Sequence, residues 1–119
     1  MERQLFKQLQ VWKGKADRKP LILKGARQVG KTYLLQQFGK ACFEKLHYCN
    51  FEKDSSLSSI FEEALTPKRI VSRLELSLNC SIDPSSDLLI FDEIQACPKA
   101  LTSLKYFCEE MPHLPLCAA

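Results

Sequence analysis

The stretch that decides the fold of this chain is LILKGARQVGKTYLL, residues 21–35. It begins with an apolar run of the kind found in buried strands, and it ends with apolar residues at helical spacing. The whole chain has only 4 glycines, and two of them, Gly25 and Gly30, flank a short segment directly before Lys31 and Thr32. The string GARQVGKT therefore matches the pattern G-x-x-x-x-G-K-[ST], in which a loop between a strand and a helix holds the phosphates of a nucleotide.

A phosphate-binding loop needs these residue types for physical reasons. Glycines allow the backbone to approach an anion closely and to point its N–H groups at it. A helix that begins at Lys31 directs its unpaired N–H groups and its positive dipole end at the same phosphates. The Lys31 ammonium can reach the β- and γ-phosphates, and the Thr32 hydroxyl can ligate Mg²⁺. The alternative is a surface turn with an exposed Lys-Thr pair. We predict nucleotide contacts from Gly25, Ala26, Arg27, Gln28, Val29, Gly30, Lys31, Thr32 and Tyr33.

A second motif, LLIFDE at residues 88–93, consists of an apolar strand that ends in two acids. Asp92 at the carboxyl end of such a strand can hold Mg²⁺ through a water molecule, and Glu93 can act as the general base that polarises the attacking water. Taken alone, two acids here could simply cap the strand. Beside GARQVGKT we interpret them as the metal ligand and the catalytic residue, with Lys31 as a further catalytic group.

The nature of the nucleotide follows from strings that the sequence lacks. No N-K-x-D string, which would recognise guanine, and no D-x-x-G string occurs in the chain. A small-molecule kinase remains open, but Glu93 directly after Asp92 favours water as the acceptor. We therefore predict Mg²⁺-dependent hydrolysis of ATP, with ATP and Mg²⁺ as the cofactors.

Strands and helices are expected to alternate along the chain. Apolar runs predict strands at residues 21–24, 45–52, 88–91 and 114–119. Helical spacing predicts helices through Leu5, Leu9 and Trp12, then at 31–39, 60–64, 67–78 and 98–111, with Gly39 as a helix C-cap. This alternation predicts an α/β fold with a mostly parallel sheet, formed as one domain over residues 1–119.

Composition narrows the class of protein. The net charge of +3 and the scattered basic residues give little support for autonomous binding of nucleic acid, although a DNA-associated module remains an alternative. The start of the chain does not look like a signal peptide, and no run is long and apolar enough to span a membrane. The 6 cysteines show no C-x-x-C spacing. We therefore expect a cytoplasmic protein whose thiols are reduced and mostly buried.

Three segments carry a resemblance to a known family: KPLILKGARQVGKTYLLQQFG at 19–39, NFE at 50–52 and LLIFDEIQACPKALTSLKYFCEEMP at 88–112. Together they resemble the AAA-like ATP-binding proteins of bacteria and archaea. The resemblance implies a P-loop NTPase fold of three α/β/α layers with strand order 5-1-4-3-2. It also places Asn50 beside the strand that ends at Asp92. In similar ATPases a polar residue there restrains the catalytic glutamate, here Glu93, whereas an asparagine at a strand end is also a common turn former.

The family pattern continues beyond the point where this sequence ends. It includes a polar sensor residue, a fifth strand, an arginine finger and usually a second domain. We therefore expect a C-terminally truncated ATPase domain whose hydrolysis is weak, and which could form homo-oligomers through the missing part. The alternative is a nucleotide-binding switch or remnant that binds ATP without turnover.

Overall fold

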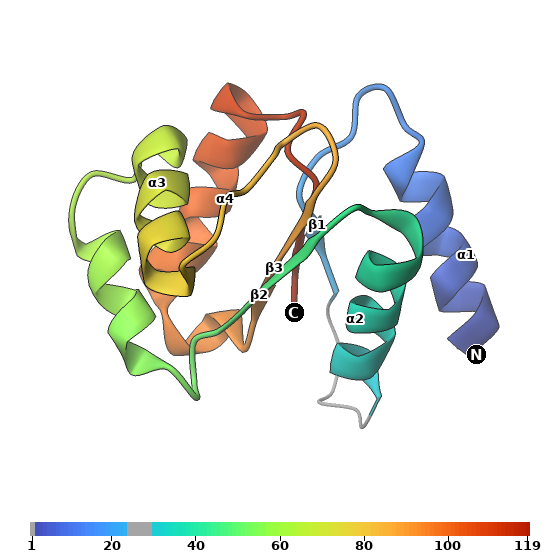
Figure 1. The fold of residues 1–119 in the computed structure, drawn as a ribbon, viewed down its shortest axis with the longest axis horizontal. Helices are drawn as coiled ribbons and strands as arrows, with labels where there is room; N and C mark the ends of the chain where they lie inside the picture. The colour runs from blue at the N-terminus through green and yellow to red at the C-terminus, as the bar shows by residue number, and fades with distance from the viewer. Residues whose placement is uncertain (1, 24–29) are drawn as a thin grey trace.

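Four parallel strands form the centre of the molecule in the computed structural model, which describes residues 2–23 and 30–119. The elements are α1 (Glu2–Lys13), β1 (Leu21–Ile22), α2 (Lys31–Cys42), β2 (Leu46–Asn50), the 3-10 segment η1 (Ser55–Glu62), α3 (Pro67–Leu78), β3 (Leu88–Asp92), the 3-10 segment η2 (Ile94–Ala96), α4 (Pro98–Glu110) and β4 (Leu116–Ala118). Helices α1 and α2 cover one face of the sheet, and α3, α4 and η1 cover the other (Figure 1). The predicted three-layer α/β fold is confirmed.

The strand order is β1-β4-β3-β2, and every pair is parallel. This order agrees with the one that the family resemblance implies for these four strands. In the register of β2 and β3, Asn50 is the partner of Asp92. Because all strands run the same way, the polar residues at their carboxyl ends gather at one edge of the sheet.

Aromatic side chains anchor β3 on the side of α3 and α4. The ring of Phe91 makes edge-to-face contacts with those of Phe51, Phe61 and Phe107 at centroid distances of 5.3, 5.9 and 6.1 Å. All four rings are at most 2% exposed. Such pairs each contribute about 0.5–1.5 kcal/mol beyond the burial of their area. Asp92 is thus the last residue of a strand that is packed on this face by four buried aromatic rings.

A second cluster joins α1 and α2 to the opposite face of the sheet. Phe38 of α2 lies at its centre, and its ring contacts those of Phe6, Trp12 and Phe43 at centroid distances of 5.8, 6.3 and 5.3 Å. Trp12 also donates from its indole N–H to the Lys19 carbonyl at 2.7 Å. These contacts fix α2, and therefore its first residues, relative to the sheet.

The end of α2 differs from the sequence prediction. Gly39 is a buried residue inside the helix rather than its C-cap, because α2 continues to Cys42 and Phe43 is the cap. A Cβ on Gly39 would lie 2.8 Å from Cδ1 of Leu46. The glycine is therefore needed for the close approach of α2 to β2. The predicted helix at 60–64 is also corrected, since it lies mostly within the 3-10 segment η1.

All 6 cysteines have free thiols, as expected. Cys49, Cys97 and Cys117 are buried, and the other three are half-buried. In the part of the chain that the structure describes, no helix combines the length and apolar character that crossing a bilayer requires.

Candidate functional site

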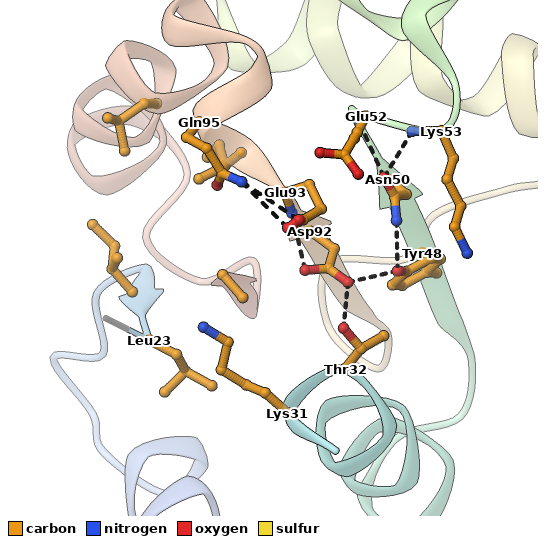
Figure 2. Close-up of a pocket in the computed structure, with 14 residues that line it drawn as sticks. Leu23, Lys31, Thr32, Tyr48, Asn50, Glu52, Lys53, Asp92, Glu93 and Gln95 are labelled. Carbon is orange, nitrogen blue, oxygen red and sulfur yellow. Dashed lines mark hydrogen bonds between the residues drawn. The ribbon is translucent and has the colours of Figure 1, made fainter. Parts of the chain in front are cut away.

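A cavity of about 760 Å³ opens at the carboxyl ends of the strands, and its size is typical of small-molecule sites. Its walls come from the start of α2, the ends of β1, β2 and β3, the residues that follow these strands, and single residues of α4 and after β4 (Figure 2). Six of the lining residues are Lys31, Thr32, Tyr48, Asn50, Asp92 and Glu93. The structure thus brings together most of the site residues that the sequence predicts outside the loop.

The start of α2 has the backbone geometry that the motif requires. Gly30 is the N-cap with φ 103° and ψ −15°, a left-handed conformation that glycine adopts without strain. Gly30 has no side chain that could cap the first N–H groups of the helix, so these groups can bind an anion. Lys31 extends from this point into the cavity in Figure 2. The predicted phosphate contacts at residues 25–29 lie outside the described residues.

The side chain of Asp92 is only 4% exposed, and its carboxylate accepts three hydrogen bonds. Its Oδ2 accepts from the Thr32 hydroxyl and from the Tyr48 hydroxyl, both at 2.6 Å. Its Oδ1 accepts from the backbone N–H of Glu93 at 2.9 Å. A buried carboxylate with three donors is well compensated for the loss of water. The orientation of the Asp92 carboxylate is therefore fixed.

The contact between Thr32 and Asp92 fits the predicted Mg²⁺ site. Both supply oxygen atoms, which are the ligands that Mg²⁺ prefers. Among the described residues no group of three or more His, Cys, Asp or Glu side chains could hold a metal ion. Mg²⁺ in nucleotide sites typically uses one or two protein oxygens together with phosphates and water, so one carboxylate and one hydroxyl are sufficient. The role of these two residues as ligands stays a prediction.

Glu93 has an unusual backbone. Its φ of 52° and ψ of 44° make it one of two non-glycine residues with positive φ in the described segments. Such a conformation costs about 1 kcal/mol or more and persists where the surrounding structure enforces it. Here the Ile94 N–H donates to the Ala119 carbonyl at 3.0 Å, and the Ala119 N–H donates to the Phe91 carbonyl at 2.9 Å. The turn after β3 is thereby tied to β4.

The carboxylate of Glu93 lines the cavity. It accepts from Nε2 of Gln95 at 3.2 and 3.4 Å. Glu93 is half-buried, whereas the neighbouring Asp92 is buried. The two adjacent acids therefore occupy different environments, as the two different predicted roles require.

Asn50 forms the turn after β2. Its Oδ1 accepts from the backbone N–H groups of Glu52 and Lys53 at 3.0 and 2.9 Å, and its Nδ2 donates to the Tyr48 hydroxyl at 3.1 Å. These contacts support the turn-former interpretation. The restraint of Glu93 by Asn50 stays a prediction.

Tyr48 is the site residue that the sequence analysis missed. Burial, together with the hydrogen bond to Asp92, raises the pKa of Tyr48 to about 12, so its hydroxyl remains a donor at neutral pH. The alternation of side chains along a strand places residues 48 and 50 on one face, and this was the only available signal. Conversely, Tyr33, a predicted contact, is 65% exposed and is not among the residues that line the cavity.

A second polar cluster lies at the amino ends of β2 and β3. Nε2 of His47 lies 2.8 Å from Oδ2 of Asp87, and Nδ1 of His47 lies 3.4 Å from Sγ of Cys80. Asp87 also accepts from the backbone N–H of Asp83 at 2.9 Å. Burial opposes the charged form of Asp87, but the bonds from Asp83 and His47 outweigh it and lower the pKa of this carboxyl. The cluster lies at the opposite end of the strands from the cavity.

Comparison with known protein families agrees with this geometry. A family model described as an AAA domain matches residues 17–118. The chain belongs to this AAA domain family. Family membership confirms the resemblance and identifies the fold as that of an AAA-like ATPase domain. Searches of curated proteins and of solved structures each found no match.

Proposed function

We propose that this AAA domain binds ATP together with Mg²⁺ in the cavity at the carboxyl edge of its sheet, and that it hydrolyses the bound nucleotide. One observation carries the proposal: the Thr32 hydroxyl lies 2.6 Å from the Asp92 carboxylate, although the two residues are 60 positions apart. The fold thus brings Thr32 of the GARQVGKT motif into contact with Asp92 of the LLIFDE motif. If Asp92 and Glu93 only capped the end of β3, the contact between Asp92 and Thr32 would not be needed.

The start of α2 supplies the phosphate contacts. The uncapped N–H groups of its first turn and its positive dipole end favour an anion at this point. The Lys31 ammonium extends into the same cavity and neutralises phosphate charge. The loop between Gly25 and Gly30 would complete the cradle with its backbone N–H groups.

Thr32 and Asp92 would hold Mg²⁺ through their side-chain oxygens. When bound, Mg²⁺ neutralises negative charge on the phosphates and orients the terminal phosphoryl group for in-line attack. Asp92 suits this role because its carboxylate is already oriented by three donors. Little reorganisation of the protein is then needed when the nucleotide binds.

Glu93 would polarise the water that attacks the terminal phosphate. Glu93 lines the cavity beside Asp92, and the backbone at Glu93 has a positive φ. A half-buried glutamate can accept the proton of the attacking water at its carboxylate oxygen. The hydrogen bond from Gln95 limits the positions of this side chain.

The proposal is tested with two isosteric variants, Asp92→Asn and Glu93→Gln. ATP affinity is measured by calorimetry in excess Mg²⁺ and in EDTA, and phosphate release is measured at saturating ATP. Asp92→Asn should lose most of the gain in affinity that Mg²⁺ provides, whereas Glu93→Gln should bind ATP like the parent and release no phosphate. Glu110→Gln, an exposed position at the end of α4, is the charge-matched control.

Two outcomes would change the proposal. Equal effects of Asp92→Asn and Glu93→Gln on affinity would contradict the assignment of roles. Tight binding without phosphate release from the parent would instead favour a nucleotide-binding switch.

A further inference from the structure

A chain of hydrogen bonds connects the end of β2 to the end of β3. Nδ2 of Asn50 donates to the Tyr48 hydroxyl at 3.1 Å, and this hydroxyl donates to Oδ2 of Asp92 at 2.6 Å (Figure 2). We propose that Tyr48 is a positioning residue that orients the Asp92 carboxylate for Mg²⁺, and that Asn50 sets the direction of the Tyr48 hydroxyl. The inference rests on the proposed function, because it takes Asp92 as a ligand of Mg²⁺.

Asn50 fixes the direction in which the hydrogen bonds from Asn50 through Tyr48 to Asp92 are donated. Oδ1 of Asn50 accepts from two backbone N–H groups, those of Glu52 and Lys53, so the amide cannot be flipped without losing both bonds. The NH₂ group of Asn50 must then face Tyr48, and it can only donate. The Tyr48 oxygen accepts that bond, and its single proton is left for Asp92.

Tyr48 holds Asp92 from within the sheet. Tyr48 and Asp92 lie on the neighbouring strands β2 and β3, which are paired over five positions. The other donor to Oδ2 is Thr32, which lies on α2 and is itself a predicted ligand of Mg²⁺. In this proposal Tyr48 is therefore the donor to Oδ2 that is not itself a ligand of Mg²⁺.

A fixed carboxylate binds a metal ion more tightly than a mobile one. Removal of a side chain that orients a metal ligand typically lowers metal affinity about 10- to 100-fold. Tyr48→Phe keeps the ring and removes only the donor. It should lower the gain in ATP affinity from Mg²⁺ about tenfold, and it should leave the affinity in EDTA unchanged.

Asn50→Asp tests the direction of the chain. An aspartate keeps an acceptor for the N–H groups of Glu52 and Lys53, but its second oxygen accepts where Asn50 donates. The Tyr48 proton is then drawn away from Asp92, so the gain from Mg²⁺ should fall in this variant as well. If the hydrogen bonds from Asn50 through Tyr48 to Asp92 had no such role, an added carboxylate near the site should raise the gain in ATP affinity from Mg²⁺, because it attracts the cation. In the Tyr48→Phe background, Asn50→Asp should cause no further fall in the gain from Mg²⁺, since the hydrogen bond from Tyr48 to Asp92 is already absent.

The experiment measures the ratio of ATP affinity in excess Mg²⁺ to that in EDTA by calorimetry. The set comprises the parent, Tyr48→Phe, Asn50→Asp, their double variant, Lys31→Ala, and Tyr106→Phe as the matched control on α4. Thermal unfolding of each variant is recorded in parallel. The proposal predicts a lowered ratio for both single variants, no further fall in the double variant, and an unchanged ratio for Tyr106→Phe.

Other outcomes separate this inference from the proposed function. A parental ratio in Tyr48→Phe, together with loss of binding in Lys31→Ala, would overturn the positioning role and leave the proposed function standing. An equal fall of both affinities in Tyr48→Phe would also overturn it, because it would indicate only a structural role. Unchanged binding in Lys31→Ala would contradict the proposed function itself.

Discussion

Strands β2 and β3 carry a polar cluster at each end, and the two clusters are built for different purposes. At the amino ends, His47 and Asp87 are 5% and 2% exposed, and they bond to each other and to Cys80 and Asp83. At the carboxyl ends, Asp92 is equally buried, but it lies beside a cavity of about 760 Å³ that Lys31 also lines.

The difference shows how to separate structural polar groups from binding groups in one protein. A buried polar cluster whose members satisfy one another contributes to stability, and its loss leaves unpaired groups in the core. A cluster that opens to a cavity at the start of a helix can still bind a ligand. Changes at the amino ends should therefore lower stability, and changes at the carboxyl ends should lower nucleotide affinity.

The largest effect on stability is expected for Asp87→Ala. This change removes the acceptor of the His47 ring and of the Asp83 N–H in a buried place, which should lower the free energy of unfolding by about 3 kcal/mol. Urea denaturation measures the loss. ATP affinity, measured where the variant is still folded, should match that of the parent. A variant as stable as the parent would contradict the structural role of the amino-end cluster.

A smaller effect on stability is expected for Gly39→Ala. Gly39 is a buried residue of α2, the helix whose first residues line the cavity. The new Cβ would meet Leu46 at 2.8 Å, and overpacking of this kind costs about 1–3 kcal/mol. Higher helix propensity returns up to about 1 kcal/mol, so a net loss of about 1 kcal/mol is expected. Gly14→Ala is the matched control, because a Cβ there meets no atom closer than 3.7 Å. Equal stability of the two variants would show that α2 does not need its close approach to β2.

The smallest effect is expected for the pH dependence of the stability that the amino-end cluster contributes. The pKa of Asp87 is lowered in the folded state, so its contribution to stability is present above the ordinary value of 3.8 and is lost as pH falls through the lowered value. The difference in unfolding free energy between the parent and Asp87→Asn should therefore shrink as the pH falls below 3.8. Urea denaturation over a pH series checks this. A difference that stays constant down to the lowest pH would argue against an ionised Asp87.

The sequence allowed the centre of the site to be predicted, because its signals are local. A glycine-rich string before a helix and two acids after an apolar strand suffice to expect that Thr32 and Asp92 meet. The parallel sheet followed from the alternation of elements, but the order of its strands required the family resemblance.

Contacts between side chains far apart in the sequence could not be predicted in this way. The sequence predicts Tyr48 only as part of the strand at 45–52, since nothing near it in the sequence marks Asp92 as its partner. The pair of His47 and Asp87 was missed for the same reason. The predicted C-cap at Gly39 is wrong because a glycine late in a helix usually ends it, whereas here the close contact with Leu46 requires a glycine inside the helix.

The most direct test of the account is the ATP affinity of Lys31→Ala in excess Mg²⁺, measured by calorimetry beside Lys40→Ala. Both lysines lie on α2, but Lys31 lines the cavity and Lys40 is exposed near the other end of the helix. The loss of a charge-assisted contact to the phosphates should cost about 1.5–3 kcal/mol, which is roughly a ten- to hundred-fold weaker affinity. We predict this loss for Lys31→Ala and parental affinity for Lys40→Ala. Equal affinity of the parent and Lys31→Ala would contradict the binding of phosphate at the start of α2.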